Sequence, residues 1–208
     1  EHKLGSVYER RGDWELAESH FEAALAALGQ DGAAGVRSRI YADWSRTTYH
    51  HRQIKQALTL AQQALDLAET AQDTRALAQA HNTLGILASS QDDLPNARRH
   101  LEQSLALAEQ LDDLSARIAA LNNLALACRS SGDIDRAIEL TEAALALCAA
   151  LGDRHREAAL HNNLADLLHS AGRTEAAMPH LKQAVSIYAA IDTEAGPLQP
   201  EIWKLTEW

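Results

Sequence analysis

Proline, cysteine and aromatic residues are scarce in this sequence. Among 208 residues there are four prolines and two cysteines, and aromatic residues make up 4%. Cys128 and Cys148 lie within apolar stretches, so they are too few and too embedded to indicate the disulfide framework of a small secreted protein. We interpret both as small core residues of a chain from a reducing, cytoplasmic setting.

Long apolar runs and basic character are missing as well. No apolar run approaches the roughly 20 residues needed to cross a bilayer, and the first residues lack the basic-then-apolar pattern of a signal peptide. The formal net charge is −10, so the chain repels phosphate backbones and anionic lipid surfaces at long range. We therefore expect neither nucleic acid nor a membrane as a partner.

The usual patterns of catalytic and metal sites do not occur either. His50 and His51 are adjacent, and no carboxylate or thiolate completes a ligand set with His161 and His169. A glycine-rich phosphate loop and a nucleophile elbow are absent from the sequence. We expect no enzymatic activity, no cofactor and no bound metal.

The sequence does have an internal repeat of forty residues, built mainly from alanine and leucine. One column is alanine throughout: Ala17, Ala57, Ala97, Ala137 and Ala177. A second column is large and apolar, and a small residue follows each member: Leu4 and Gly5, Trp44 and Ser45, Leu84 and Gly85, Leu124 and Ala125, Leu164 and Ala165. Small residues let two helices approach closely, so these columns are expected where the helices of a pair cross.

Glycine and aspartate mark the ends of the expected helices. Gly12, Gly132 and Gly172 share one phase of the repeat, and Asp13 and Asp133 follow the first two. Such a pair is typical of a helix end followed by an N-cap, whose carboxylate accepts backbone N–H groups of the next helix. We therefore predict an all-α fold with antiparallel helix pairs at about 1–30, 36–70, 74–110, 114–150 and 155–191.

The two ends of the array differ. Residues 192–208 break the pattern at Pro197 and Pro200, and Trp203 and Trp208 give the last stretch an apolar face, so we predict a capping segment there. The first residues have mid-helix character without an N-cap, which suggests a chain cut from a longer protein. An uncovered first repeat should expose apolar surface, so self-association through this repeat is an expectation.

The first repeat resembles the tetratricopeptide repeat (TPR) family. Its Leu4, Gly5, Tyr8, Ala17, Phe21 and Ala24 stand at the places of the family pattern. The forty-residue unit resembles the repeats of kinesin light chains, of spindle-orientation adaptors and of bacterial regulators. The resemblance implies a right-handed α-solenoid of five helix-turn-helix repeats that binds a peptide or protein segment in a concave groove.

Polar residues on the first helix of each pair are the predicted peptide-binding residues. Asparagine recurs at Asn82, Asn122 and Asn162, and Thr83, Asn123 and Asn163 follow directly. A carboxamide both donates and accepts hydrogen bonds, so a ladder of them could hold the backbone of an extended peptide. The remaining predicted groove residues are Arg39, Arg46, Tyr49 and His50 near the start and Asp166 near the end. His2 and Lys3 add to the basic start, which favours an acidic ligand segment there.

Three functions remain open from the sequence, and structural self-association through the uncapped end is the third. The first is a protein-protein interaction module that binds a peptide or protein segment in the groove. The alternative is a sensory or autoinhibitory region of a larger bacterial signalling or transcriptional regulator.

Overall fold

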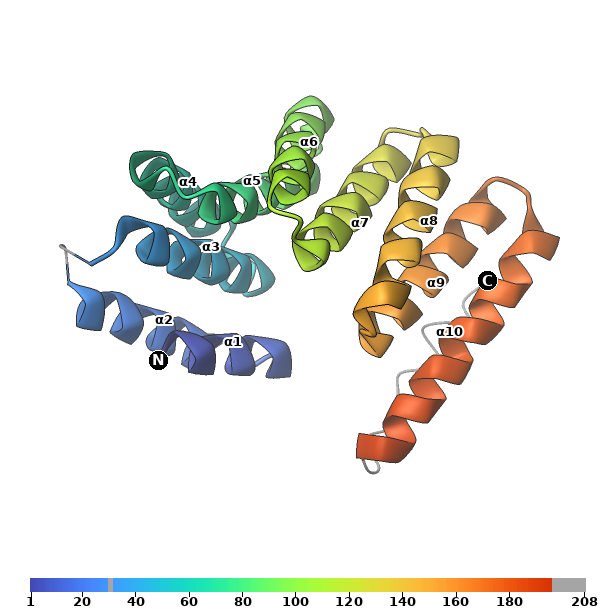
Figure 1. Cartoon of the computed structure of the whole chain (residues 1–208), viewed down its shortest axis with the longest axis horizontal. Coiled ribbons are helices and arrows are strands. Elements are labelled where there is room, and N and C mark those ends of the chain that lie inside the picture. The colour runs from blue at the N-terminus through green and yellow to red at the C-terminus, as the bar shows by residue number, and fades with distance from the viewer. Residues whose placement is uncertain (30–31, 196–208) are drawn as a thin grey trace. The chain divides into compact units, whose positions relative to one another are not determined.

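The computed structural model describes residues 1–29 and 32–195, and every regular element in these ranges is an α-helix (Figure 1). The helices are α1 (His2–Arg11), α2 (Trp14–Leu28), α3 (Ala34–His50), α4 (Ile54–Ala71), α5 (Thr74–Ser90), α6 (Leu94–Gln110), α7 (Leu114–Ser130), α8 (Ile134–Leu151), α9 (Arg154–Ser170) and α10 (Thr174–Ala195). Short turns join consecutive helices into antiparallel pairs. The predicted all-α repeat architecture is confirmed.

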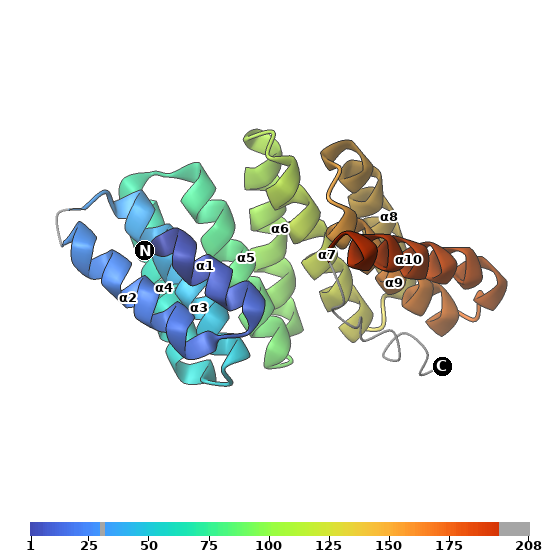
Figure 2. The same ribbon diagram turned by 90° about the horizontal axis from the view of Figure 1, so that it is seen from below.

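The chain divides into two compact units, Glu1–Ala116 and Arg117–Trp208. One array over residues 1–191 was predicted from the sequence, and the boundary between the two units lies within it. Within the first unit, α2 packs on α3 and α4 packs on α5, and the first helices α1, α3 and α5 follow one another (Figure 2). Within the second unit, α9 packs against both α8 and α10.

Small residues lie where the helices of a pair cross, as the columns predict. All five alanines of the Ala17 column are almost fully buried. A Cβ atom added to Gly5 would lie 2.6 Å from the ring of Phe21, and one added to Gly85 would lie 2.5 Å from Leu101 Cγ. The close approach of the two helices therefore depends on the missing side chain.

Serine hydroxyls join the helices at other crossings. Ser38 Oγ donates to the carbonyl oxygen of Ala64 at 2.7 Å, and Ser104 Oγ donates to that of Ala78 at 2.8 Å. The two bonds connect equivalent positions of successive repeats, with the donor on the first helix in one case and on the second helix in the other. The hydroxyls of Ser38 and Ser104 thus find backbone partners on the other helix of their pair.

Where the sequence has the predicted glycine-aspartate pair, the glycine ends the first helix as expected, but one of the two aspartates does not cap the next helix. Gly12 and Gly132 end α1 and α7 with φ of 78° and 81°, a left-handed conformation that glycine adopts without strain. Asp93 and Asp133 accept backbone N–H groups of α6 and α8. Asp13, predicted as a cap, makes no such bond, because its carboxylate turns toward Arg11, 3.4 Å from Nε.

Other expectations concern the ends and the environment of the chain. Helix α10 continues to Ala195, so the first residues predicted as a cap are helical, and the rest of 192–208 lies outside the described residues. Leu4 is 47% exposed, unlike Leu164 in the same column at 1%. Cys128 and Cys148 are both buried, as predicted. Among the helices described, none is long and apolar enough to cross a membrane.

Candidate functional site

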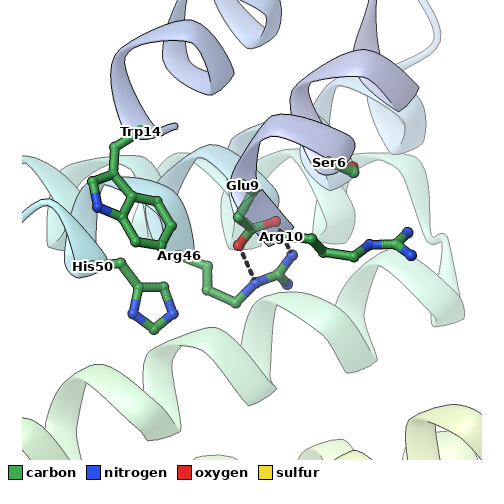
Figure 3. A pocket seen from close by; sticks show the side chains of 6 residues that line it. All are labelled: Ser6, Glu9, Arg10, Trp14, Arg46 and His50. Carbon is green, nitrogen blue, oxygen red and sulfur yellow. Dashed lines mark hydrogen bonds and ion pairs between the residues drawn. The ribbon is translucent and has the colours of Figure 1, made fainter. Parts of the chain in front are cut away.

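A hollow of about 370 Å³ lies beside the first helices of the first two repeats (Figure 3). It is lined by Ser6, Glu9 and Arg10 of α1, by Trp14 at the start of α2, and by Arg46 and His50 of α3. Ser6 and Arg10 stand forty residues before Arg46 and His50, so equivalent positions of two repeats form the wall.

An ion pair between Glu9 and Arg46 lines this hollow. Arg46 donates from Nε and Nη2 to the two carboxylate oxygens of Glu9, at 2.6 and 2.7 Å, and its Nη2 lies 3.1 Å from Asp43 Oδ1. Burial alone would lower the pKa of Arg46, but the hydrogen bond to Glu9 and the charge of Asp43 raise it overall. Arg46 therefore stays charged, and much of its charge is neutralised within the protein.

Trp14 and His50 form an aromatic wall. Their rings stack with centroids 5.3 Å apart and an angle of 18° between the planes. Burial lowers the pKa of His50; the charge of Glu9 opposes this shift and that of Arg46 adds to it. The imidazole is thus neutral at neutral pH, and the wall is suited to flat or apolar groups.

Asp43 connects the first helices of three repeats. Its carboxylate lies 2.7 Å from His2 Nε2 and accepts a hydrogen bond of 2.7 Å from Gln79 Nε2. His2 and Arg46 were predicted as basic groove residues, whereas Asp43 and Glu9 were not predicted to lie beside them. These two carboxylates offset the predicted basic character at the start of the groove.

A second hollow, of about 200 Å³, lies between α7 and α9 of the second unit. Its lining combines three carboxamides and one guanidinium with apolar side chains: Asn122, Asn123, Asn163, Arg156, Ile118, Ala119, Ala159 and Leu160. Asn163 Nδ2 donates to Asn122 Oδ1 at 2.9 Å. Asn122 and Asn163 are forty-one residues apart in the sequence, as are His2 and Asp43, so the two contacts join equivalent positions of successive repeats.

The predicted site residues fall into three groups. Arg46 and His50 line the first hollow, and Asn122, Asn123 and Asn163 line the second. Arg39, Tyr49, Asn82, Asn162 and Asp166 are half-buried on first helices and line neither hollow. Thr83, predicted to face the ligand, is 3% exposed and donates its hydroxyl to the Gln79 carbonyl, so it belongs to the core.

The sequence analysis missed Ser6, Glu9, Arg10 and Trp14. The repeat itself carried a signal for three of them, because a step of forty residues back from the predicted residues Arg46, Tyr49 and His50 leads to Ser6, Glu9 and Arg10. Trp14 has no such signal. Glu9 and Arg46 are thirty-seven residues apart in the sequence. This separation differs from the forty-residue period, so their contact depends on the stagger of the helices.

The side chains that line the two hollows include carboxamides, a stacked aromatic pair and paired charges. Within the described residues, no group of three or more His, Cys, Asp or Glu side chains could hold a metal ion. Burial raises the pKa of the Cys148 thiol, which disfavours the nucleophilic thiolate. Groups of the kinds that line the hollows form hydrogen bonds, stacking contacts and ion pairs with a bound ligand.

Comparisons with known proteins agree with the repeat architecture. Three family models, each described as a tetratricopeptide repeat, match residues 2–33, 77–111 and 116–190. Together these matches cover more than half of the chain. A comparison with curated proteins finds no match.

Solved structures with similar folds include repeat proteins of several kinds. A putative kinesin light chain with nearly identical TPR-like repeats from P. anserina shares 22% identity over 91% of this chain and 94% of its own, with a TM-score of 0.64. A Rap protein complexed with competence and sporulation factor shares 19% identity over 90% and 52%, with a TM-score of 0.82. A STAND protein with a tetratricopeptide repeat sensor from Pyrococcus horikoshii shares 14% over 93% and 30%, with a TM-score of 0.75.

Proposed function

Because the chain belongs to the tetratricopeptide repeat family, we propose that it binds an extended peptide segment of a partner protein along its first helices. The repeats indicate a protein-interaction module, without specifying its ligand. The proposal adds the kind of ligand and the residues that hold it. It assigns the chain a binding role and no catalytic step.

The hollow between α7 and α9 is the observation that carries the proposal. Asn122, Asn123 and Asn163 present carboxamides from two successive repeats beside Ile118 and Leu160. A peptide backbone has alternating N–H and C=O groups, and a carboxamide can accept a hydrogen bond from the first and donate one to the second. The bond between Asn163 and Asn122 uses one donor and one lone pair, so both amides retain hydrogen-bonding capacity. Ile118 and Leu160 are almost fully buried, so the half-buried Ala119 and Ala159 are the apolar residues that a side chain of the ligand can contact.

The hollow of the first unit is proposed as a second binding place, independent of the hollow between α7 and α9. Trp14 and His50 provide a flat surface for an apolar or aromatic side chain. Arg46 is already neutralised by Glu9 and Asp43, so Arg10 supplies the positive charge in this lining. The expected acidic ligand segment is therefore proposed to pair with Arg10.

Selection from a phage-displayed library of linear peptides tests the proposal. Enriched peptides are synthesised, and their affinity is measured by fluorescence anisotropy for the wild type and for Asn122→Ala/Asn163→Ala. Each hydrogen bond lost to the ligand should cost about 0.5–1.5 kcal/mol of binding free energy. Asn96→Ala is the matched control, because it removes a carboxamide from α6, outside both hollows.

The outcome separates binding from folding. The double substitution removes both partners of one hydrogen bond, so no polar group of that bond is left unpaired and the melting temperature should change little. Unchanged peptide affinity in the folded double variant would show that the asparagines do not hold the ligand. A library that yields no binding peptide at all would contradict the proposal as a whole.

The alternative function, a sensory region of a larger regulator, has one observation in its favour. The STAND protein with a similar fold carries its tetratricopeptide repeats as a sensor, and the matched part is 30% of that chain. An ATPase or DNA-binding domain encoded in the same reading frame as this array would support the alternative. Peptide binding at the same hollows would then serve as the sensed signal.

A further inference from the structure

Two histidine pairs connect the helices of a repeat, one pair in each unit. His81 of α5 and His100 of α6 have their Nδ1 atoms 2.9 Å apart. His161 of α9 and His180 of α10 have theirs 3.0 Å apart, and the ring centroids are 5.2 Å apart in both pairs. The pairs are separated by eighty residues, or two repeats, so they occupy equivalent places.

The two positions of each pair change together along the array. In the second and fourth repeats they hold apolar residues, Tyr41 with Leu60 and Leu121 with Leu140. In the first repeat they hold Glu1 and His20, whose Oε2 and Nδ1 atoms are 2.7 Å apart. In each repeat the two positions are therefore either both apolar or both polar. In the third and fifth repeats both are histidines.

An arginine distinguishes the first histidine pair from the second. Arg99 Nη2 lies 3.1 Å from His100 Nε2. A guanidinium can only donate, so Nε2 of His100 accepts and its proton resides on Nδ1, which donates to His81. A cation at His100 Nδ1 would require this proton to move to Nε2, where it would face Arg99. The equivalent of Arg99 in the fifth repeat is Pro179, which has no such donor.

The geometry of the second pair suits cis ligation of a metal ion. Imidazole nitrogens bind Zn²⁺ at about 2.0–2.1 Å, which places two neighbouring ligand atoms about 2.9–3.4 Å apart in square or tetrahedral arrangements. The Nδ1 atoms of His161 and His180 have this separation. We propose that His161 and His180 bind a divalent transition metal ion of the zinc, copper and nickel class and so join α9 to α10.

The surroundings of the pair support a cation. Both imidazoles are half-buried, so coordination positions remain for water. Glu157 stands one turn before His161 on α9, and its negative charge acts on that imidazole. No metal was expected from the sequence, because the two histidines of this pair are nineteen residues apart along the chain and meet only across a helix pair.

Titration of the tag-free full chain with ZnCl₂ by calorimetry at neutral pH tests the site. One equivalent of Zn²⁺ should bind at least about tenfold more tightly than any further equivalents. His161→Gln and His180→Gln should each abolish the tight equivalent. His81→Gln makes the same chemical change at the equivalent place in the first unit, and this variant should still bind the tight equivalent of Zn²⁺. With Cu²⁺, electron paramagnetic resonance should show two coordinated nitrogens in the wild type and one in either variant.

A gain of binding provides an independent test. Arg99→Ala removes the donor at His100 Nε2, so this variant should bind a second tight equivalent of Zn²⁺, which His81→Gln should remove again. Unchanged Zn²⁺ binding in folded His161→Gln and His180→Gln would show that the pair is only a hydrogen bond. A loss of the tight equivalent in the surface variant His155→Gln would likewise overturn the proposal, since binding would then come from scattered histidines.

Discussion

Alanine side chains at the helix crossings set the distance between the helices of a pair. Ala137 is 0% exposed, like three other members of its column. Ala137→Leu should lower the free energy of unfolding by about 1–3 kcal/mol, because the added methylene groups force the helices apart. Thermal or urea unfolding followed by circular dichroism measures the effect.

Ala143→Leu on the same helix is the matched control. Ala143 is exposed, so the added side chain meets solvent and not another helix. Its free energy of unfolding should remain within about 0.5 kcal/mol of the wild type. Equal effects of the two substitutions would mean that α8 does not pack through Ala137.

Protonation of His100 should make the stability of the first unit depend on pH. Burial, then the charges of Arg99 and His81, lower its pKa in the folded chain to about 4, against an ordinary value of 6.5. The unfolded chain therefore takes up a proton below pH 6.5, while the folded chain does so only near 4. The free energy of unfolding should fall as the pH decreases across this window.

Urea denaturation of the wild type and of His100→Gln at several pH values measures this contribution. Carboxylates also titrate in part of the window, so the informative quantity is the difference between the two proteins. The wild type should lose more stability than His100→Gln between neutral pH and pH 4. Parallel curves would show that His100 binds its proton equally well in both states.

Residue-scale features divide into those that the repeat predicts and those that it does not. The burial of Ala17 and its equivalents follows from the sequence, because one residue type recurs at one phase. The environment of Arg46 does not, since Glu9 and Asp43 approach it from positions unrelated by a repeat step. Side-chain partners depend on the stagger between helices, which a period does not encode.

Capping carboxylates act at the scale of the helix. Asp133 accepts the N–H of Arg136 at the start of α8, so Asp133→Ala should lower the free energy of unfolding by about 0.5–2 kcal/mol. Asp13 precedes α2 at the same phase but makes no side-chain capping bond. Asp13→Ala should therefore cost less, since its exposed pair with Arg11 contributes little.

Chemical denaturation of both variants compares the two positions directly. A larger loss for Asp133→Ala than for Asp13→Ala agrees with the different capping contacts. Equal losses would indicate that Asp13 caps α2 in solution despite its orientation toward Arg11.

Helix ends follow from the sequence where a breaker is present. Gly132 ends α7 as predicted, because its left-handed conformation suits glycine. The end of α10 was predicted at residue 191, but the helix continues to Ala195 because the first breakers, Gly196 and Pro197, come later. Departure from the repeat pattern alone does not end a helix.

At the scale of the whole molecule, apolar residues on the first helix favour association. Leu4 and Val7 are both 47% exposed and stand three residues apart, on one face of α1. We expect the wild type to self-associate through this face at high concentration, as the sequence suggested. Leu4→Glu/Val7→Glu should remain monomeric, and sedimentation velocity over a range of concentrations measures the difference.

Lys3→Glu is the control for the added charge, because Lys3 is also exposed on α1. This variant should associate like the wild type. A wild-type chain that remains monomeric at every concentration would contradict the prediction of self-association.

The candidate site was predictable in part. Recurrence of asparagine led to Asn122, Asn123 and Asn163, which share one hollow. The recurrence did not distinguish these three residues from Asn82 and Asn162, which are also asparagines but do not line this hollow. Which members of a column meet in space depends on how neighbouring repeats pack.

The most direct test of the account is to observe the side-chain amides of the second hollow during peptide binding. In ¹⁵N-labelled protein, the amide resonances of Asn122, Asn123 and Asn163 report on their hydrogen bonds. Titration with a selected peptide should shift these resonances with one common dissociation constant, while that of Asn96 on α6 stays in place. A peptide that binds with the reverse pattern, moving Asn96 and leaving the three asparagines unchanged, would contradict peptide recognition by the first helices.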